Sequence, residues 1–143
     1  MAFAPNAIPA YAVGPLEVVP VALPAAAKTT MTDTTNAVQV LPLTGTVASG
    51  RKLAVQKLVV RSVASLSSGR MMAFLYNGTT AIFAKDIAHP STTVSTTAGA
   101  ADIDFGFTDA DALIIPEGYA LYVGSAVAQA SGAAVIAGRG KTF

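Results

Sequence analysis

Short runs of hydrophobic residues, separated by turn-forming residues, cover the chain from residue 36 to its end. No stretch keeps the 3.6-residue period of an amphipathic helix, and the runs are rich in Val, Ile and Leu, which is typical of strands. Eight strands are predicted, at residues 37–41, 53–63, 71–76, 79–85, 102–107, 113–115, 119–127 and 133–139. We therefore expect an all-β antiparallel sandwich, with a jelly roll as its most plausible form.

Three local signals refine this pattern. Asn77-Gly78 predicts a hairpin with a two-residue type I′ turn, since both central positions of that turn need positive φ. A second turn is predicted at Pro116-Glu117-Gly118. The run at 53–63 alternates poorly around Gln56, which indicates either a β-bulge or a strand covered on both faces.

Residues 1–35 follow a different pattern, because five of the eight prolines lie there at intervals of four to six residues. Each proline fixes φ and keeps its predecessor extended. Residues 2–27 are therefore predicted to form an extended arm, and the polar run 28–36 a slack linker to a domain at 36–143. A disordered tail is the alternative. Hydrophobic side chains favour an arm that docks on a partner, namely Ile8, Tyr11, Leu16, Val18, Val21 and Leu23.

Composition adds a reason to expect assembly. The chain has 143 residues, 52% apolar and only 12% charged, about half the ~25% of an ordinary soluble domain. The prolines interrupt any membrane helix, and the first Lys is Lys28, so no signal peptide is predicted. We expect a protein made in the cytoplasm whose surface is covered by copies of itself or by a partner. A net charge of +1 argues against a nucleic-acid partner.

Candidate catalytic and metal-binding chemistry is sparse. His89 is the only histidine and there is no cysteine, so we expect a loop histidine, either solvated or at a subunit contact. The acidic run 102–111 lacks the ligand spacing of a calcium loop. It predicts a strand with Ile103, Phe105 and Phe107 inward, followed by a turn. We expect no enzyme activity, cofactor or metal.

Charge is distributed unevenly along the chain. Residues 28–85 hold seven basic residues and one acid, whereas residues 86–138 hold six acids and no Lys or Arg. The two groups either neutralise each other within a subunit or pair between copies in a head-to-tail ring. In the second case the basic group faces the acidic one, and the residues involved are Arg51, Lys52, Lys57, Arg61, Arg70, Asp109, Asp111 and Glu117.

The stretches LVVRSVASLSSGRMMAFLYNGTTAIFAKDIA and DADALIIPEGYALYVGS combine a hairpin with a strand of the form (I/L)xxPxGxxLyv. With the proline-rich arm, they resemble small virion proteins of tailed bacteriophages, especially capsid decoration (cement) proteins, over residues 53–127. The resemblance implies a homotrimeric knob on the capsid surface of the virion, whose arm lies over neighbouring subunits of the major capsid protein. A tail or fibre module that binds a host receptor or glycan is the alternative, with Tyr11, Tyr76, Tyr119 and Tyr122 as available aromatics.

Overall fold

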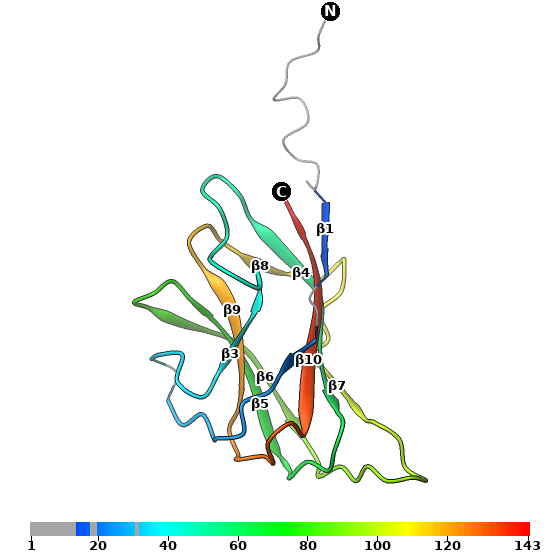
Figure 1. Cartoon of the computed structure of the whole chain (residues 1–143). Coiled ribbons are helices and arrows are strands. Elements are labelled where there is room, and N and C mark those ends of the chain that lie inside the picture. Colours follow the sequence, from blue (N-terminus) through cyan, green and yellow to red (C-terminus); the bar gives the residue numbers. More distant parts are fainter. Residues whose placement is uncertain (1–13, 18–19, 31) are drawn as a thin grey trace, which may run out of the picture.

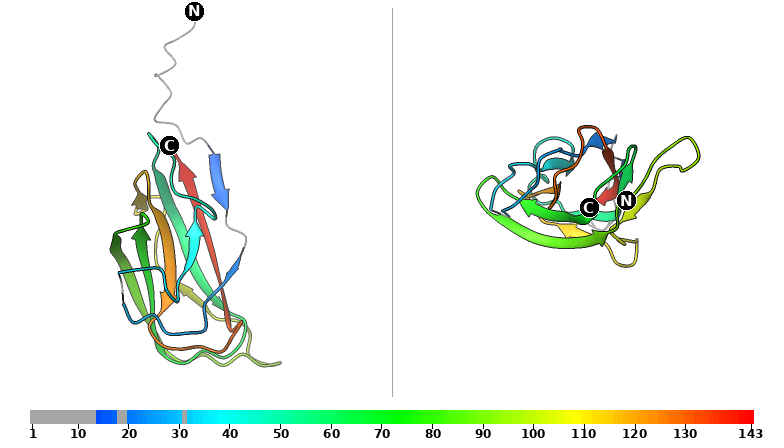
Figure 2. Two further views of the ribbon diagram at one scale, coloured as in Figure 1. Left: turned by 60° about the vertical axis from the view of Figure 1, so that its left-hand side comes forward. Right: turned by 90° about the horizontal axis from the view of Figure 1, so that it is seen from below.

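The computed structural model describes residues 14–17, 20–30 and 32–143. Within these residues the chain forms ten strands and no helix, arranged as two antiparallel sheets that face each other (Figures 1 and 2). The all-β sandwich predicted from the sequence is thereby confirmed. The jelly-roll form stays a prediction.

The first sheet has the strand order β1-β10-β4-β7, with β2 also pairing with β10 and β8 with β4. Its strands are β1 (Gly14–Glu17), β2 (Val21–Ala22), β4 (Leu53–Ser62), β7 (Asp102–Asp104), β8 (Leu113–Ile115) and β10 (Ala134–Thr142). The second sheet has the order β3-β9-β5-β6. Its strands are β3 (Val38–Leu41), β5 (Gly69–Tyr76), β6 (Ala81–His89) and β9 (Ala120–Ser125). Each of the eight predicted strands is present.

The core lies between the two sheets, because alternate side chains of each strand point inward. Val60 of β4 and Ile136 of β10 are register partners, and neither is exposed to solvent. Gly138 of β10 lies close to Leu41 of β3 on the other sheet, since a Cβ there would be 3.1 Å from Leu41 Cδ1. A larger side chain at this position would push the sheets apart.

Gln56 is the extra residue of a β-bulge. Lys57 pairs with Arg139 and Val55 with Gly140, so Gln56 has no register partner on β10. The bulge lets both Val55 and Leu58 point into the core although they are three residues apart. The broken alternation allowed either a bulge or a strand covered on both faces; the bulge is present, and β4 also has buried residues on both faces.

The β5–β6 hairpin is present, but its turn differs from the prediction. Tyr76 pairs with Ala81, so the loop has four residues, 77–80, rather than two. Among its residues only Gly78 has positive φ, and Asn77 instead accepts hydrogen bonds through Oδ1 from the amides of Thr79 and Thr80. The type I′ prediction is wrong because the asparagine side chain closes the turn in place of its backbone.

Candidate functional site

Part of the outer face of the second sheet, over β9 and β5, is covered by residues 24–30 and 32–36 of the same chain, a segment that we call the strap (Figure 1). The amide of Lys28 donates to Ser125 O over 2.7 Å, and the Asn36 side chain donates to Ala27 O over 2.8 Å. The strap includes the predicted linker, so the structure contradicts the idea that residues 28–36 provide slack. The first bond holds the strap against β9, and the second joins the two ends of the strap to each other.

Lys28 is the central contact of the strap. It is only 2% exposed, its Nζ donates to Thr35 O over 2.9 Å, and its ammonium group lies 5.1 Å from the centroid of the Phe74 ring. Nζ also forms an ion pair with Asp33 over 3.2 Å. The pKa of Asp33 is lowered, first by the hydrogen bond from the Thr35 amide and then by Lys28. A lysine in a polar run gives no sequence signal of this burial.

Gly124 of β9 is the position where the strap passes closest to the sheet. A Cβ built there would lie 2.9 Å from Asn36 O and 3.1 Å from Lys28 Cδ. Met72 and Gly124 are register partners, so the Met72 side chain lies on the same outer face of the sheet as a side chain at position 124 would. The strap explains why Met72 is only 4% exposed although it points away from the core between the sheets.

The predicted arm residues separate into three groups. Leu23 is 4% exposed and belongs to the core of this chain, and Val21 packs against that core, so neither is available to a partner. Leu16 lies in β1, which pairs with β10 at the edge of the first sheet. Ile8, Tyr11 and Val18 lie outside the described residues. The prolines allow this arrangement because an edge strand tolerates a residue that lacks an amide hydrogen.

The outer face of the first sheet carries a hollow of about 420 Å³. Apolar residues form part of its lining, and charged residues surround it. The lining comprises Pro20, Lys57, Val59, Arg61, Asp102, Val135, Ala137, Gly138 and Arg139. Such an open and mixed surface suits a contact with another macromolecule.

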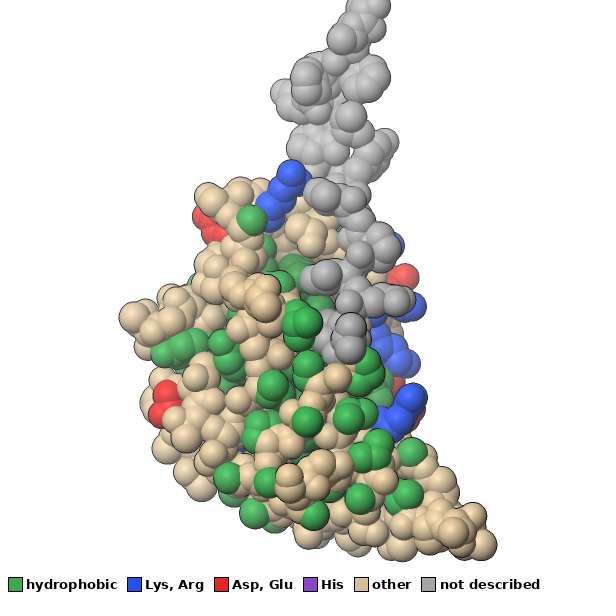
Figure 3. All heavy atoms as spheres, in the orientation of Figure 1, with side chains coloured by type: hydrophobic (Ala, Val, Ile, Leu, Met, Phe, Trp, Pro, Cys, Tyr) green, Lys and Arg blue, Asp and Glu red, His purple; other side chains and the backbone are tan. Residues whose placement is uncertain are grey.

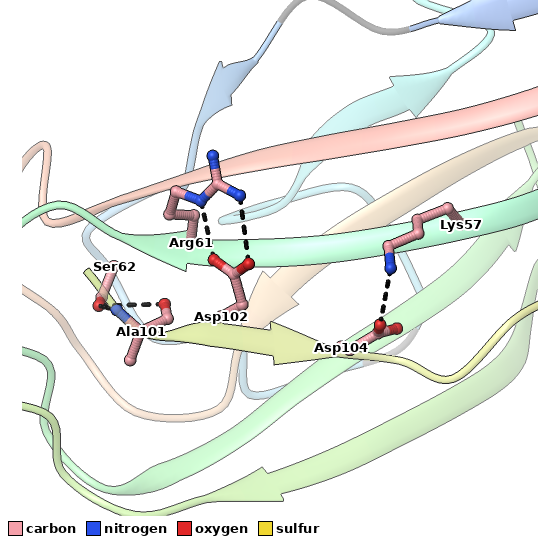
Figure 4. A network of polar contacts seen from close by, with 6 residues as sticks. All are labelled: Lys57, Arg61, Ser62, Ala101, Asp102 and Asp104. Atoms are coloured by element: carbon pink, nitrogen blue, oxygen red, sulfur yellow. Dashed lines mark hydrogen bonds and ion pairs between the residues drawn. The ribbon is translucent and has the colours of Figure 1, made fainter. Parts of the chain in front are cut away.

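Two of the cations at this hollow are paired within the chain (Figure 4). Arg61 binds Asp102 through two bonds, from Nε to Oδ1 over 2.8 Å and from Nη2 to Oδ2 over 3.1 Å. Lys57 Nζ lies 3.2 Å from Asp104 Oδ2. The hydrogen bonds from Arg61 lower the pKa of Asp102, and Asp102 in turn raises the pKa of Arg61.

Within the described part of the chain, no ion pair joins any two of the eight residues predicted to pair between copies. Lys57 is paired with Asp104 and Arg70 with Asp86. Arg61 is taken up by Asp102, which favours the alternative of neutralisation within the subunit. Glu117 accepts a hydrogen bond from the Gly50 amide. The remaining four side chains are exposed, namely Arg51, Lys52, Asp109 and Asp111.

In the acidic run 102–111 the side chains face the predicted way, but the strand is shorter than the predicted 102–107, since β7 ends at Asp104. Ile103 and Phe105 are buried and Phe107 packs against the core, while Asp102 and Asp104 are exposed. The turn that follows is closed by the Asp111 amide, which donates to Thr108 Oγ1 over 3.0 Å. The pKa of Asp104 is lowered, chiefly because its carboxylate accepts from the Gly106 amide. In the part of the chain that the structure describes, no group of three or more His, Asp or Glu side chains could hold a metal ion.

His89 is not a solvated loop residue. It ends β6 and is 6% exposed, and its Nδ1 lies 3.0 Å from Pro90 O. Its Nε2 is buried and has no hydrogen-bond partner among the described residues. The predicted loop position is wrong, because β6 continues past Lys85 and ends at His89, whose side chain is buried rather than solvated. The alternative of a subunit contact stays a prediction.

One end of the sandwich lacks charged residues, and we call it the uncharged end. It is formed by the loops at 63–68, 90–101 and 126–133 and by residues 24–27, none of which contains Lys, Arg, Asp or Glu. Figure 3 shows hydrophobic and uncharged polar side chains over this lower part of the molecule. The four segments are distant in sequence, so the pattern is visible only once the strand order is known.

Comparisons with known proteins give no match: no family model, no curated protein and no solved structure is significantly similar to this chain. No helix that could cross a membrane occurs within residues 14–17, 20–30 and 32–143.

Proposed function

We propose that the protein is a non-enzymatic structural protein of a virus particle. It oligomerises on the capsid surface and holds neighbouring capsid subunits together through the residues that precede β1. This proposal extends the resemblance to capsid decoration proteins, and it is supported by physical features of the fold. No catalytic role is assigned to any residue.

The observation that carries the proposal is the opposite placement of two features of the fold. Gly14, the first residue of β1, pairs with Thr142, so β1 begins beside the end of the C-terminal strand β10. Ser62 pairs with Ala134 at the other end of the same sheet, and the uncharged end begins there. A protein that joins its own copies at one end and reaches a particle from the other needs this arrangement.

The low charge of the chain supports the same proposal. Exposed hydrophobic side chains are present on several loops and strands, including Val63 at 48% and Phe83 at 49% exposure. Burial of apolar surface stabilises by about 25 cal/mol per Å², before the costs of association are subtracted. Repeated contacts over a particle make a modest gain at each copy sufficient.

Particle binding by a truncated protein tests the proposal. The full chain and a variant lacking residues 2–13 are mixed with particles that lack the protein, and binding is measured by co-sedimentation. We expect the full chain to sediment with the particles and the truncated chain to remain in solution with an unchanged fold. Equal binding by both proteins would exclude the clamp, and it would favour the alternative of a tail or fibre module that binds a receptor or glycan.

A further inference from the structure

The uncharged end has the properties of a preformed contact surface. Its exposed hydrophobic side chains include Val63, 48% exposed, and Val127, 38% exposed. Exposed alanines surround them in the same loops, at positions 64, 128 and 130. A surface without charge can be removed from water without separating an ion from its hydration shell.

Hydrogen bonds between the loops hold this surface in one shape. The amides of Val63 and Ala64 both donate to Ala133 O, over 2.8 and 3.0 Å. Leu66 and Thr92 form a two-way bridge between the loops at 63–68 and 90–101. Because the loops are already ordered, docking loses little conformational entropy.

Gln129 joins these loops to the start of the strap. It is 8% exposed, and its side-chain Oε1 accepts a hydrogen bond from the backbone amide of Ser67 over 2.9 Å. The backbone amide of Gln129 donates to Ala25 O over 2.8 Å. Three of the four segments of the uncharged end are therefore fixed by one side chain and its backbone. The Gln129 side chain is thus buried, and the exposed side-chain polar groups of this end are the Ser and Thr hydroxyls of the loops.

Charge identifies the occupant of this surface. A partner that presents charged groups would lose their hydration and gain no opposite charge in return, so the matching surface must itself be uncharged. On a second copy of this chain the loops of the opposite end carry Arg51, Lys52 and Glu117, and the outer face of the first sheet carries the ion pairs. The exposed Ile82 and Phe83 lie on β6, a strand that also carries Lys85 and Asp86. The surface on a second copy that carries no charge is therefore the same uncharged end.

We infer that the uncharged end of one copy packs against the uncharged end of another, around a symmetry axis that passes through this end. The inference rests on the oligomer in the proposed function and names the surface that forms it. In this arrangement the start of β1 lies at the end of each subunit that is far from the symmetry axis, and this far end can face a particle.

Charge placed near the axis provides the test. Val63→Lys brings like charges together in every copy, whereas Ile114→Lys changes a side chain of nearly equal exposure, 46%, on β8. Mass photometry and sedimentation velocity of the full-length proteins measure association. We expect Val63→Lys to weaken self-association by about tenfold or more and Ile114→Lys to leave it unchanged. Cooperative thermal unfolding confirms that both variants are folded.

A charge-reversal mixture separates self-contact from any other effect of the substitution. Val63→Lys and Val63→Glu proteins associate poorly alone, and we expect a mixture of the two to recover the mass of the wild-type oligomer. Failure of the mixture to recover, dissociation by Ile114→Lys instead, or a wild-type protein that is monomeric at micromolar concentration would each overturn the inference. Particle co-sedimentation is read separately, so loss of particle binding by an intact oligomer counts against the proposed function alone.

Discussion

The two outer faces of the sandwich differ in how they meet solvent. On the second sheet, Phe74 points outward yet is not exposed, because the strap and Lys28 cover it. On the first sheet, the outward positions carry Lys57 and Arg61, and their partners on β7 are exposed carboxylates. The chain itself therefore covers the outer face of the second sheet over β5 and β9, while Phe83 of β6 on that face stays 49% exposed, and the outer face of the first sheet carries exposed ion pairs.

This difference teaches where the stability of the fold is concentrated. Packing of the strap against Phe74 and Met72 removes apolar surface from water, which contributes strongly to stability. Exposed ion pairs contribute little, because water and salt screen them. Changes to the strap should therefore have larger effects than changes to the ion pairs, although the strap looks like a linker in the sequence.

Deletion of residues 2–27 is expected to have the largest effect. It removes Leu23 and the backbone of β1 and β2, and the loss of a buried Leu side chain alone costs about 2–5 kcal/mol of a typical 5–15 kcal/mol. Thermal unfolding followed by circular dichroism should show no cooperative transition near that of the full chain. Deletion of residues 2–13 is the control, and a large loss of stability in that variant would contradict the assignment of the fold to residues 14 onward.

Lys28→Ala should be the most harmful single change in the strap. It removes the side chain that packs on Phe74 and leaves Thr35 O without its donor, at a cost of about 2 kcal/mol in urea unfolding. Lys28→Met keeps the packing and should recover most of the loss. Lys52→Ala, at an exposed position, is the control and should change stability by less than about 0.5 kcal/mol. Equal effects of the Lys28→Ala and Lys52→Ala substitutions would show that the strap does not pack on the sheet.

Gly124→Ala examines the close approach of the strap directly. The added methyl group meets Asn36 O at 2.9 Å, so the strap must move, and we expect a loss of about 1–3 kcal/mol. Gly99→Ala is a matched control, because a Cβ at that position meets no atom within 4 Å and its φ is not positive. Urea denaturation of both variants measures the difference. A neutral Gly124→Ala would mean that residues 28–36 are slack after all.

Arg61→Met should have the smallest effect, and the effect should depend on pH. Arg61 lowers the pKa of Asp102 in the folded protein below the ordinary 3.8, so the unfolded state binds the proton first as pH falls. The stabilisation by this pair is thus present above pH 3.8 and is lost as pH falls through the folded pKa. The melting temperatures of wild type and Arg61→Met should differ slightly at pH 7 and converge in acid, while Arg51→Met should match wild type throughout. A gap between wild type and Arg61→Met that persists or widens in acid would contradict this account.

Local pattern was enough to predict much of the fold. The eight strands, the bulge at Gln56 and the burial of Ile103 and Phe105 follow from alternation, because a side chain's face is decided by its neighbours along the strand. Turn chemistry located the hairpin at Asn77 but gave the wrong turn type, since Asn can close a turn with its side chain as well as its backbone.

The sequence by itself thus determined that this chain is an all-β sandwich with little charge. Tertiary structure alone decided that Lys28 is buried, because its partners Phe74 and Gly124 lie far away in sequence and no local pattern connects them. The same reason applies to the uncharged end, which antiparallel pairing assembles from four separate segments. A local pattern records which face of a strand is apolar, and only the packed fold decides which distant segments share a surface.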